Sequence, residues 1–295
     1  MTIDKLDRYL KEVYSKDTCY PKCVNDWDEE NKTLGHCAVV SLIVNEYFGG
    51  EIYKVDLENI SHYFNYIDNE VIDLTSEQFD FKISYENKML KTREEMISNK
   101  DTENRYNLLN TRLKLILIDE EITGCNLCKS MVEKFPNSKT VSYGKNNDIV
   151  ILGEAPANNG WRKSGVAWYD VNGKILPSGK ILQKLLDEIN LKLEEIYFIE
   201  AVKCYPINRK DLSKCSENCK QYLFKQLEII KPKIILTLGD IATKAIIDTK
   251  YKKFSDVVGK EIDVKGYKVI PIYHPSPISP MSYKGNIDIF KNLKI

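Results

Sequence analysis

Apolar runs alternate with amphipathic segments over the second half of the chain. Four short runs rich in β-branched residues have the pattern of buried strands, and each is followed by a segment with the apolar spacing of a helix. The expected elements, in chain order, lie at 148–153, 178–190, 196–202, 217–230, 233–239, 240–247, 268–273 and 283–293. Strands separated by helices indicate right-handed βαβ crossovers. The pattern predicts an α/β fold, a three-layer α/β/α domain with a four-stranded parallel sheet.

The first part of the chain has a different pattern. Helices are expected at 1–14 and at 33–50, the second closed by Gly49 and Gly50, and strands at 60–67 and 70–75. We therefore expect a small α+β domain over 1–83. The following residues are rich in Lys, Glu, Asn and Arg, which is typical of exposed helices. We place a charged helical linker at 84–120 and the second domain at 121–295.

Length and charge narrow the functional classes. A chain of 295 residues is long enough for two cores. Lys plus Arg and Asp plus Glu are 43 each, so any contact with a nucleic acid must come from a local patch. The sequence has no apolar run of membrane-spanning length, and its start reads as an amphipathic helix and not as a signal peptide. We expect a cytoplasmic protein without a membrane partner.

Polar and proline-rich residues follow the predicted parallel strands. Ligands of such sheets bind beyond the carboxyl ends of the strands. This reading places residues 153–156, 200–204, 274–277 and Gly239 at that edge. The sequence therefore predicts a ligand site there.

Five ordered segments resemble family 4 of the uracil-DNA glycosylase superfamily. They are GEAP (153–156), SG before a helix (178–179), VKCYPINR (202–209), NCKQYL (218–223) and YHPSPISP (273–280). The similarity covers residues 124–295. It implies an enzyme of base-excision repair that hydrolyses the N-glycosidic bond of uracil, or of another modified pyrimidine, flipped out of single- or double-stranded DNA. DNA is the expected partner, and no protein partner is expected.

The cysteines carry a cofactor expectation. Eight cysteines in a reducing compartment indicate metal binding or catalysis more often than disulfides. The resemblance implies that four of them hold a structural [4Fe–4S] cluster: Cys125, Cys128, Cys204 and Cys219. Zinc is the alternative occupant of four thiolates. Cys215 is the alternative fourth ligand.

The resemblance also assigns roles around a flipped base. His274 is expected to donate a hydrogen bond to O2 of the pyrimidine as negative charge develops on the departing base. Glu154 is expected to orient water or to stabilise the cationic sugar. Ser276 would hold a phosphate and Ile278 would fill the vacated stack.

Further residues are expected to bind the base or the DNA backbone. Trp168 is the candidate ring that stacks on the base, with Tyr169 as its alternative, and Ala155 belongs to the base pocket. The amides of Ser178 and Gly179 begin a helix and are expected to bind a phosphate. Core burial of the rings and a solvated loop are the structural alternatives.

Two positions depart from the family pattern. Glu200 in EAVKC replaces the asparagine that reads the base. An ionised carboxylate only accepts hydrogen bonds, which suits an exocyclic amine better than O4 of uracil, unless burial keeps the acid protonated. The second departure is the stretch ANNGWRKS after GEAP, where the family has acidic residues.

The N-terminal part resembles the uncharacterised YunG family over residues 12–82. Cys37 is expected at the start of a helix, His62 at the start of a strand and Asp73 on the next strand. A cysteine, a histidine and a carboxylate on such elements predict a papain-like domain with a second site. A buried thiol with a structural histidine is the alternative.

Three classes of function follow. The first is an active glycosylase. The second is a module that binds nucleic acid or a base without turnover. The third is a Cys–His hydrolase at the N-terminal domain with a DNA-targeting C-terminal domain.

Overall fold

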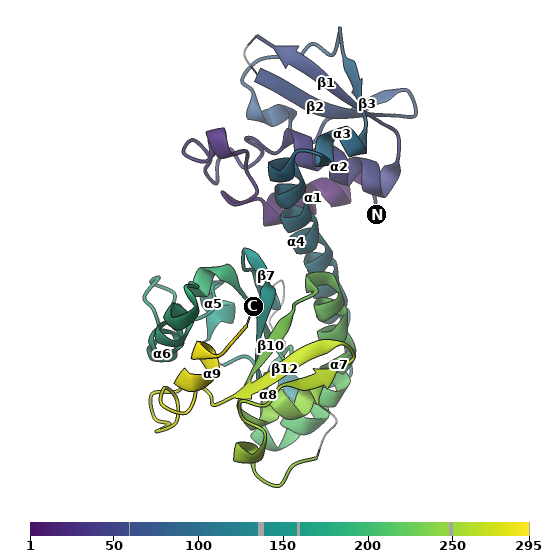
Figure 1. The fold of residues 1–295 in the computed structure, drawn as a ribbon. Helices are drawn as coiled ribbons and strands as arrows, with labels where there is room; N and C mark the ends of the chain where they lie inside the picture. The colour runs from purple at the N-terminus through teal and green to yellow at the C-terminus, as the bar shows by residue number, and fades with distance from the viewer. Residues whose placement is uncertain (59, 135–138, 158–159, 248–249, 295) are drawn as a thin grey trace. The chain divides into compact units, whose positions relative to one another are not determined.

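The computed structural model describes residues 1–58, 60–134, 139–157, 160–247 and 250–294. The chain forms two compact units, Met1–Lys114 and Leu115–Ile295, which we call unit 1 and unit 2 (Figure 1). No described helix is long and apolar enough to cross a membrane.

Unit 1 is an α+β unit. Its helices include α1 (Ile3–Val13) and α2 (Cys37–Phe48). Its antiparallel sheet has the order β3-β2-β1-β4, with β1 at Glu51–Leu57, β2 at Ile60–Ile67, β3 at Glu70–Ile72 and β4 at Met89–Lys91. The pattern predicted α1, α2 and β2. It missed β1, although Lys54 and Asp56 alternate there with Tyr53, Val55 and Leu57 as in a half-buried strand.

The segment expected as an exposed linker over 84–120 is largely part of unit 1. It contains α3 (Arg93–Ile97) and most of α4 (Lys100–Gly124). Arg105 is 6% exposed and donates to the carbonyls of Thr18 and Gly35. Arg105, one of the charges that suggested an exposed helix, is therefore bonded inside the unit. The division between the units falls within α4 and not at residue 83.

Unit 2 contains a six-stranded mixed sheet in the order β11-β12-β10-β7-β8-β6. The parallel strands are β7 (Asn146–Gly153), β8 (Ile196–Glu200), β10 (Ile234–Leu238) and β12 (Tyr267–Ile272). The expected four-stranded parallel sheet was thus incomplete. Two short antiparallel strands, β6 (Val141–Ser142) and β11 (Ile262–Val264), extend its edges. They are too short to give a periodic signal.

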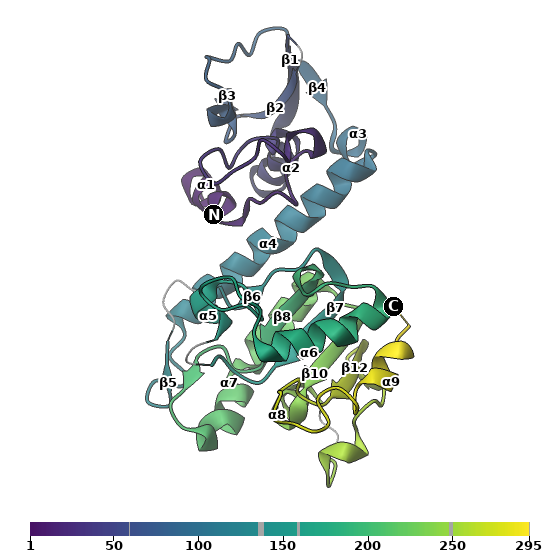
Figure 2. The ribbon, with the colours of Figure 1, turned by 90° about the vertical axis from the view of Figure 1, so that its left-hand side faces the viewer.

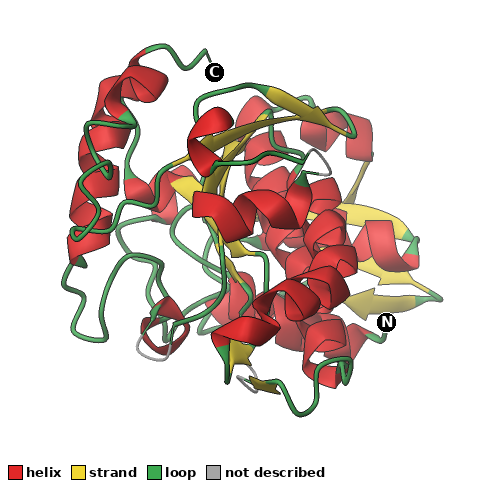
Figure 3. Ribbon diagram, turned by 90° about the horizontal axis from the view of Figure 1, so that it is seen from below, coloured by secondary structure: helices red, strands yellow, loops and turns green. Residues whose placement is uncertain are grey.

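Helices cover both faces of this sheet (Figures 2 and 3). The core on one face joins α6 (Pro177–Leu186) and α9 (Ile287–Lys291) to alternate strand residues such as Ile151 and Leu236. The core on the other face joins α7 (Leu212–Ile230) and α8 (Gly239–Ile246) to the intervening residues, such as Val150 and Ile235. Three short elements lie in the loops: α5 (Trp161–Ser164), β5 (Val132–Glu133) and β9 (Tyr205–Pro206).

The strand order locates the ligand edge of unit 2. The first parallel strand, β7, lies between β8 and β10, so the two crossovers that follow it in the sheet run in opposite directions. Such a reversal opens a crevice beyond the carboxyl ends of the strands. These ends lead into Glu154, Ala201, Gly239 and Tyr273.

Candidate active site and cysteine-lined cavity

A cleft of about 790 Å³ lies at the carboxyl ends of the parallel strands. This volume falls within the range of small-molecule sites. The cleft brings together eight of the side chains predicted from the sequence: Glu154, Ala155, Trp168, Ser178, Glu200, His274, Ser276 and Ile278.

His274 follows β12 at the edge of the cleft and is exposed. Its ring makes no hydrogen bond to the described part of the chain. The surrounding protein lowers the pKa of His274 below its ordinary value, because it removes part of the water that would solvate the charged ring. A neutral imidazole with a free N–H is the form that can donate to a developing anion without first losing a proton.

Glu154 follows β7 and pairs with Arg209 across the cleft. Arg209 Nη2 lies 2.8 Å from Glu154 Oε1, and the arginine side chain is 77% exposed. The amide of Val202 donates to the Glu154 carbonyl at 2.9 Å, which extends the β7–β8 ladder beyond the sheet. The cleft therefore combines a fixed carboxylate with an exposed cation that can contact a phosphate.

Trp168 lies in the cleft with a left-handed backbone at φ 71°. This conformation is rare for a bulky residue and is maintained only where packing enforces it. The ring packs edge-on against Phe198 with centroids 4.9 Å apart. A Cβ atom at Gly179 would lie 2.9 Å from that of Trp168, so the glycine makes room for the tryptophan. Tyr169 is not among the residues that line the cleft, and its hydroxyl donates to Glu194.

The loop after His274 carries an unusual apolar side chain. Ile278 is 91% exposed at the rim of the cleft. The amide of Ser276 donates to the His274 carbonyl at 2.8 Å and that of Ser279 to Ser276 at 3.0 Å, so the loop forms consecutive turns. Ser178 is the second residue of α6, and the residue after it, Gly179, is buried. The position of Ile278 is that of a side chain able to enter a DNA stack.

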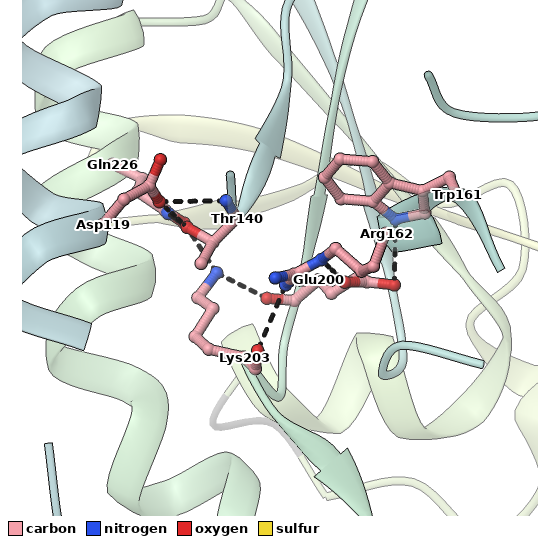
Figure 4. A network of polar contacts seen from close by, with 7 residues as sticks. All are labelled: Asp119, Thr140, Trp161, Arg162, Glu200, Lys203 and Gln226. Atoms are coloured by element: carbon pink, nitrogen blue, oxygen red, sulfur yellow. Dashed lines mark hydrogen bonds and ion pairs between the residues drawn. The ribbon is translucent and has the colours of Figure 1, made fainter. Parts of the chain in front are cut away.

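Glu200 is 2% exposed, and both carboxylate oxygens are occupied (Figure 4). Trp161 Nε1 donates to Oε1 at 3.1 Å. Arg162 donates to Oε2 from Nε at 3.1 Å and from Nη2 at 2.9 Å. Burial raises the pKa of Glu200, and the charge of Arg162 opposes this effect. Glu200 therefore belongs to a buried ion pair that reaches the cleft, a role that its sequence position did not indicate.

Buried polar contacts continue from this pair toward α4 and α7. Lys203 donates to the Glu200 carbonyl at 2.5 Å and to Gln226 Oε1 at 2.6 Å. Gln226 donates to Thr140 at 2.6 Å, and Thr140 donates to Asp119 at 2.5 Å. Burial lowers the pKa of Lys203 to about 8 and raises that of Asp119 to about 6. The loop after β8 is therefore fixed to two helices.

The four cysteines expected to bind a cofactor line one enclosed cavity. Cys125 and Cys128 come from the segment after α4, Cys204 follows β8 and Cys219 lies on α7. Strand β5 pairs with β9, which holds the first two near the third. Cys215 is not among the residues that line this cavity. Burial raises the pKa of Cys204 to about 11 and that of Cys215 to about 12 when no metal is bound.

Donor chemistry and enclosure suit a thiolate-bound cluster. The thiols are free, and apolar residues such as Val132 and Val202 line the same cavity. Asn218 donates to Cys128 Sγ at 3.1 Å, the type of contact that stabilises thiolate sulfur in such sites. No three His, Cys, Asp or Glu residues of the described chain are gathered closely enough to hold a single metal ion.

Several residues that line the cleft were not predicted from the sequence. Phe198 occupies a strand position that reads only as core, and Trp161 begins the four-residue helix α5, which is too short to give a periodic signal. Arg209 ends the segment VKCYPINR, and its charge beside a predicted carboxylate was the available signal.

Unit 1 brings Cys37, His62 and Asp73 together. Cys37 begins α2, His62 lies on β2 and Asp73 follows the last residue of β3. His62 Nε2 lies 2.6 Å from Asp73 Oδ2.

Comparisons with known proteins divide the chain in a similar way. Residues 141–293 match the family described as the uracil DNA glycosylase superfamily, and residues 2–117 match the YunG protein family. The type-4 uracil-DNA glycosylase of Archaeoglobus fulgidus is 33% identical over 172 residues, 55% of this chain and 81% of the relative. That of Thermotoga maritima is 32% identical over 174 residues, 56% of this chain and 84% of the relative. The uncharacterized protein YunG of Bacillus subtilis is 40% identical over 60 residues, 20% of this chain and 52% of the relative.

Proposed function

The chain belongs to the uracil DNA glycosylase superfamily, and we propose that unit 2 hydrolyses the N-glycosidic bond of uracil or another pyrimidine flipped out of DNA. One observation supports this most strongly: a histidine without a hydrogen bond to the described residues, an ion-paired carboxylate and a 91% exposed isoleucine meet at one cleft on the carboxyl edge of the sheet. A glycosylase needs a pocket for the base, a donor for the departing anion and a wedge for the gap in the stack. DNA is the substrate and the partner in this proposal.

In this proposal the base enters the cleft beside Trp168 and Phe198. His274, neutral at physiological pH because its pKa is lowered, donates its free N–H to O2 of the pyrimidine. This contact strengthens as the glycosidic bond breaks and negative charge develops on the base, so it favours the transition state over the ground state. A neutral donor has no proton to regain between turnovers.

Glu154 and Arg209 act on the sugar and the backbone in this proposal. The carboxylate holds the attacking water and favours the cationic sugar that forms as the bond breaks. Arg209, with 77% of its side chain exposed, contacts a phosphate of the DNA. Their ion pair spans the cleft in the free protein, so DNA would draw the guanidinium away and free the carboxylate for water.

The cysteine-lined cavity would hold a [4Fe–4S] cluster through Cys125, Cys128, Cys204 and Cys219. Zinc, the alternative occupant, would require these thiols to move closer together, since no three ligands of the described residues are near enough to hold one metal ion. The cluster would supply structural closure, joining the segment after α4 to the loop after β8. Cys219 is preferred to Cys215, because Cys219 shares the cavity with the other three.

Glu200 bears on which base is excised. Trp161 and Arg162 use only part of the acceptor capacity of the two oxygens, since a carboxylate has about four lone-pair sites. The remaining capacity suits an exocyclic amine, as in cytosine, and disfavours O4 of uracil. Replacement by asparagine, the amide of the family, should increase uracil excision by roughly tenfold to a hundredfold. Glu200→Gln offers the same amide on a side chain of the original length. If neither variant changes which base is excised, Glu200 does not take part in base recognition.

A panel of oligonucleotides tests the proposed reaction. Each carries one uracil, cytosine or modified pyrimidine, in single- or double-stranded form, and abasic sites are read as strand breaks after alkali. Abasic sites on at least one substrate are expected. Base-dependent binding without abasic sites on any of them would instead indicate a binding module without turnover.

A further inference from the structure

Unit 1 contains a cysteine, a histidine and an aspartate for which base excision has no use. They come from three elements: the first residue of α2, strand β2 and the residue after β3. His62 is fully buried, and its Nε2 lies 2.6 Å from Asp73 Oδ2, whose side chain is 4% exposed. Burying a histidine beside a carboxylate is costly unless the pair is well bonded.

The carboxylate of Asp73 is held in one orientation. Its Oδ1 accepts from the amide of Thr75 at 3.0 Å and from the Thr75 hydroxyl at 3.2 Å. Its Oδ2 accepts from Tyr85 at 2.9 Å in addition to His62. Burial alone would raise the pKa of Asp73, but these bonds and the charge of His62 lower it. The residue is therefore a fixed anion that orients the imidazole ring.

The other ring nitrogen of His62 is free for chemistry. Nδ1 is buried and forms no regular hydrogen bond with the described residues. Phe79 packs edge-on against the ring, with centroids 5.0 Å apart and planes at 89°. Burial lowers the pKa of His62, but the hydrogen bond to Asp73 and the interaction with the nearby Cys37 thiol raise it to about 9. Nδ1 thus faces the thiol while Asp73 holds Nε2.

Cys37 has the accessibility that a nucleophile needs. It is a free, half-buried thiol at the first position of a 12-residue helix, where unpaired amides favour negative charge. Cys19 in the same unit differs, since it is buried, donates to the Leu34 carbonyl at 3.1 Å and has a pKa raised by burial to about 12. The titratable groups near Cys37 and His62 are Asp73, Tyr85, Cys23 and Tyr63.

We propose that unit 1 is a thiol-dependent acyl hydrolase or transferase whose nucleophile is Cys37, with His62 as acid and base and Asp73 as the positioning residue. The substrate class is a carboxylic ester or amide. Cys37 gives its proton to His62 as Sγ attacks the carbonyl carbon; the bond to the leaving oxygen or nitrogen then breaks, and the leaving group takes that proton from His62. A water gives a proton to His62 as it attacks the thioester, the carbon–sulfur bond breaks, and His62 returns the proton to Cys37, which releases the acid and the free thiol. The same steps with an amine or alcohol in place of water give acyl transfer.

Alkylation of the full chain by iodoacetamide at pH 6.5 tests the activation of the thiol. An ordinary thiol with a pKa near 8.5 is only about 1% ionised at this pH. Cys37 should therefore react about tenfold or more faster than Cys23, a half-buried thiol of the same unit, as followed by mass spectrometry of the peptides. His62→Gln should abolish the difference. Equal rates in the unmodified protein, or an unchanged rate in His62→Gln, would overturn the proposal.

Acyl transfer is tested with p-nitrophenyl acetate. We expect a burst of about one nitrophenolate per chain and an acetyl group on the Cys37 peptide, both lost in Cys37→Ala and retained in the matched variant Cys23→Ala. Asp73→Asn should slow the burst about tenfold or more by releasing the histidine ring. Fluorescence of Trp27, the tryptophan of unit 1, reports on the folding of the variants. Base excision by unit 2 in the same samples is expected to be unchanged, so the two activities fail separately. The absence of a burst, or its survival in Cys37→Ala, would refute the proposal.

Discussion

The buried pair of Glu200 and Arg162 gives the sharpest quantitative prediction. The Glu200 and Arg162 side chains are 3% and 1% exposed, and three donated hydrogen bonds reach the carboxylate. Removing one partner of such a pair typically costs about 3–5 kcal/mol, because the other charge stays buried without compensation. Glu200→Gln should therefore lower the thermal midpoint of unit 2 by about 6–20 °C, since 1 kcal/mol corresponds to roughly 2–4 °C in a domain of this size.

The two partners should respond differently to pH. Arginine stays charged at every accessible pH, so in Glu200→Gln the uncompensated charge of Arg162 persists as the pH falls. A carboxylate that loses its cation can take up a proton, and burial already raises the pKa of Glu200. The cost of Arg162→Met should therefore decrease as the pH falls. The double variant should cost less than the sum of the two single variants.

Tryptophan fluorescence in a Trp27→Phe background can follow unit 2 alone, because Trp161 and Trp168 are then the remaining tryptophans. Lys233 and Asp148 form the matched control, an exposed pair at 3.0 Å in the same unit. Asp148→Asn should cost less than about 1 kcal/mol. If Glu200→Gln and Arg162→Met each lower the stability of unit 2 by less than about 1 kcal/mol, and if the two costs add in the double variant, then the residues form no buried ion pair in solution.

Three further predictions concern the cofactor, the wedge and acid stability. Purified protein should be brown and contain about four irons per chain. The variants Cys204→Ala and Cys219→Ser should lose the iron, whereas Cys215→Ser should keep it. Colourless protein that contains zinc would refute the cluster. Ile278→Ala should slow excision from duplex DNA about tenfold or more and leave the rate on single-stranded DNA unchanged, since only a duplex leaves a gap in its stack to be filled. Equal slowing on both substrates would show that Ile278 does not fill that gap. Burial lowers the pKa of His36 to about 3, where it contacts Thr18, Leu34 and the Tyr14 ring with Arg105 nearby. Above about pH 6.5 His36 is neutral in both the folded and the unfolded chain. Between about pH 6.5 and pH 4 only the unfolded chain takes up the proton, so the free energy of unfolding of unit 1 should fall by about 3 kcal/mol. His36→Gln should remove that part of the acid dependence in thermal unfolding, and an unchanged profile would contradict the assignment.

The pattern of the sequence predicted most of the central elements of unit 2, because buried parallel strands and their helices give strong periodic signals. Strand ends then indicated where His274 and Glu154 lie. The pattern did not predict β6 and β11, because strands of two and three residues give no periodic signal. It also failed at the expected linker, because the carbonyls that bind Arg105 come from residues far away in the chain.

The site shows the same limit at single residues. Motif order indicated the location of Glu200, yet its partner Arg162 comes from a loop 38 residues earlier. From the sequence, Glu200 was expected at the base edge either ionised or kept protonated by burial, and its pairing with Arg162 was not anticipated. Gly179 was expected to bind a phosphate through its amide, and its packing against Trp168 gives a separate reason for the missing side chain. Such corrections depend on tertiary contacts that no local pattern contains.

Single-turnover base excision by His274→Ala tests the central claim most directly. Wild type and variant are compared on the best substrate of the oligonucleotide panel, with iron content and the far-UV spectrum measured on the same samples. Loss of one donor to developing charge typically costs about a hundredfold to a thousandfold in rate. We expect a decrease of that size with unchanged iron content and folding. Equal rates in the two proteins would contradict the account, because the cleft would then not be where the glycosidic bond breaks.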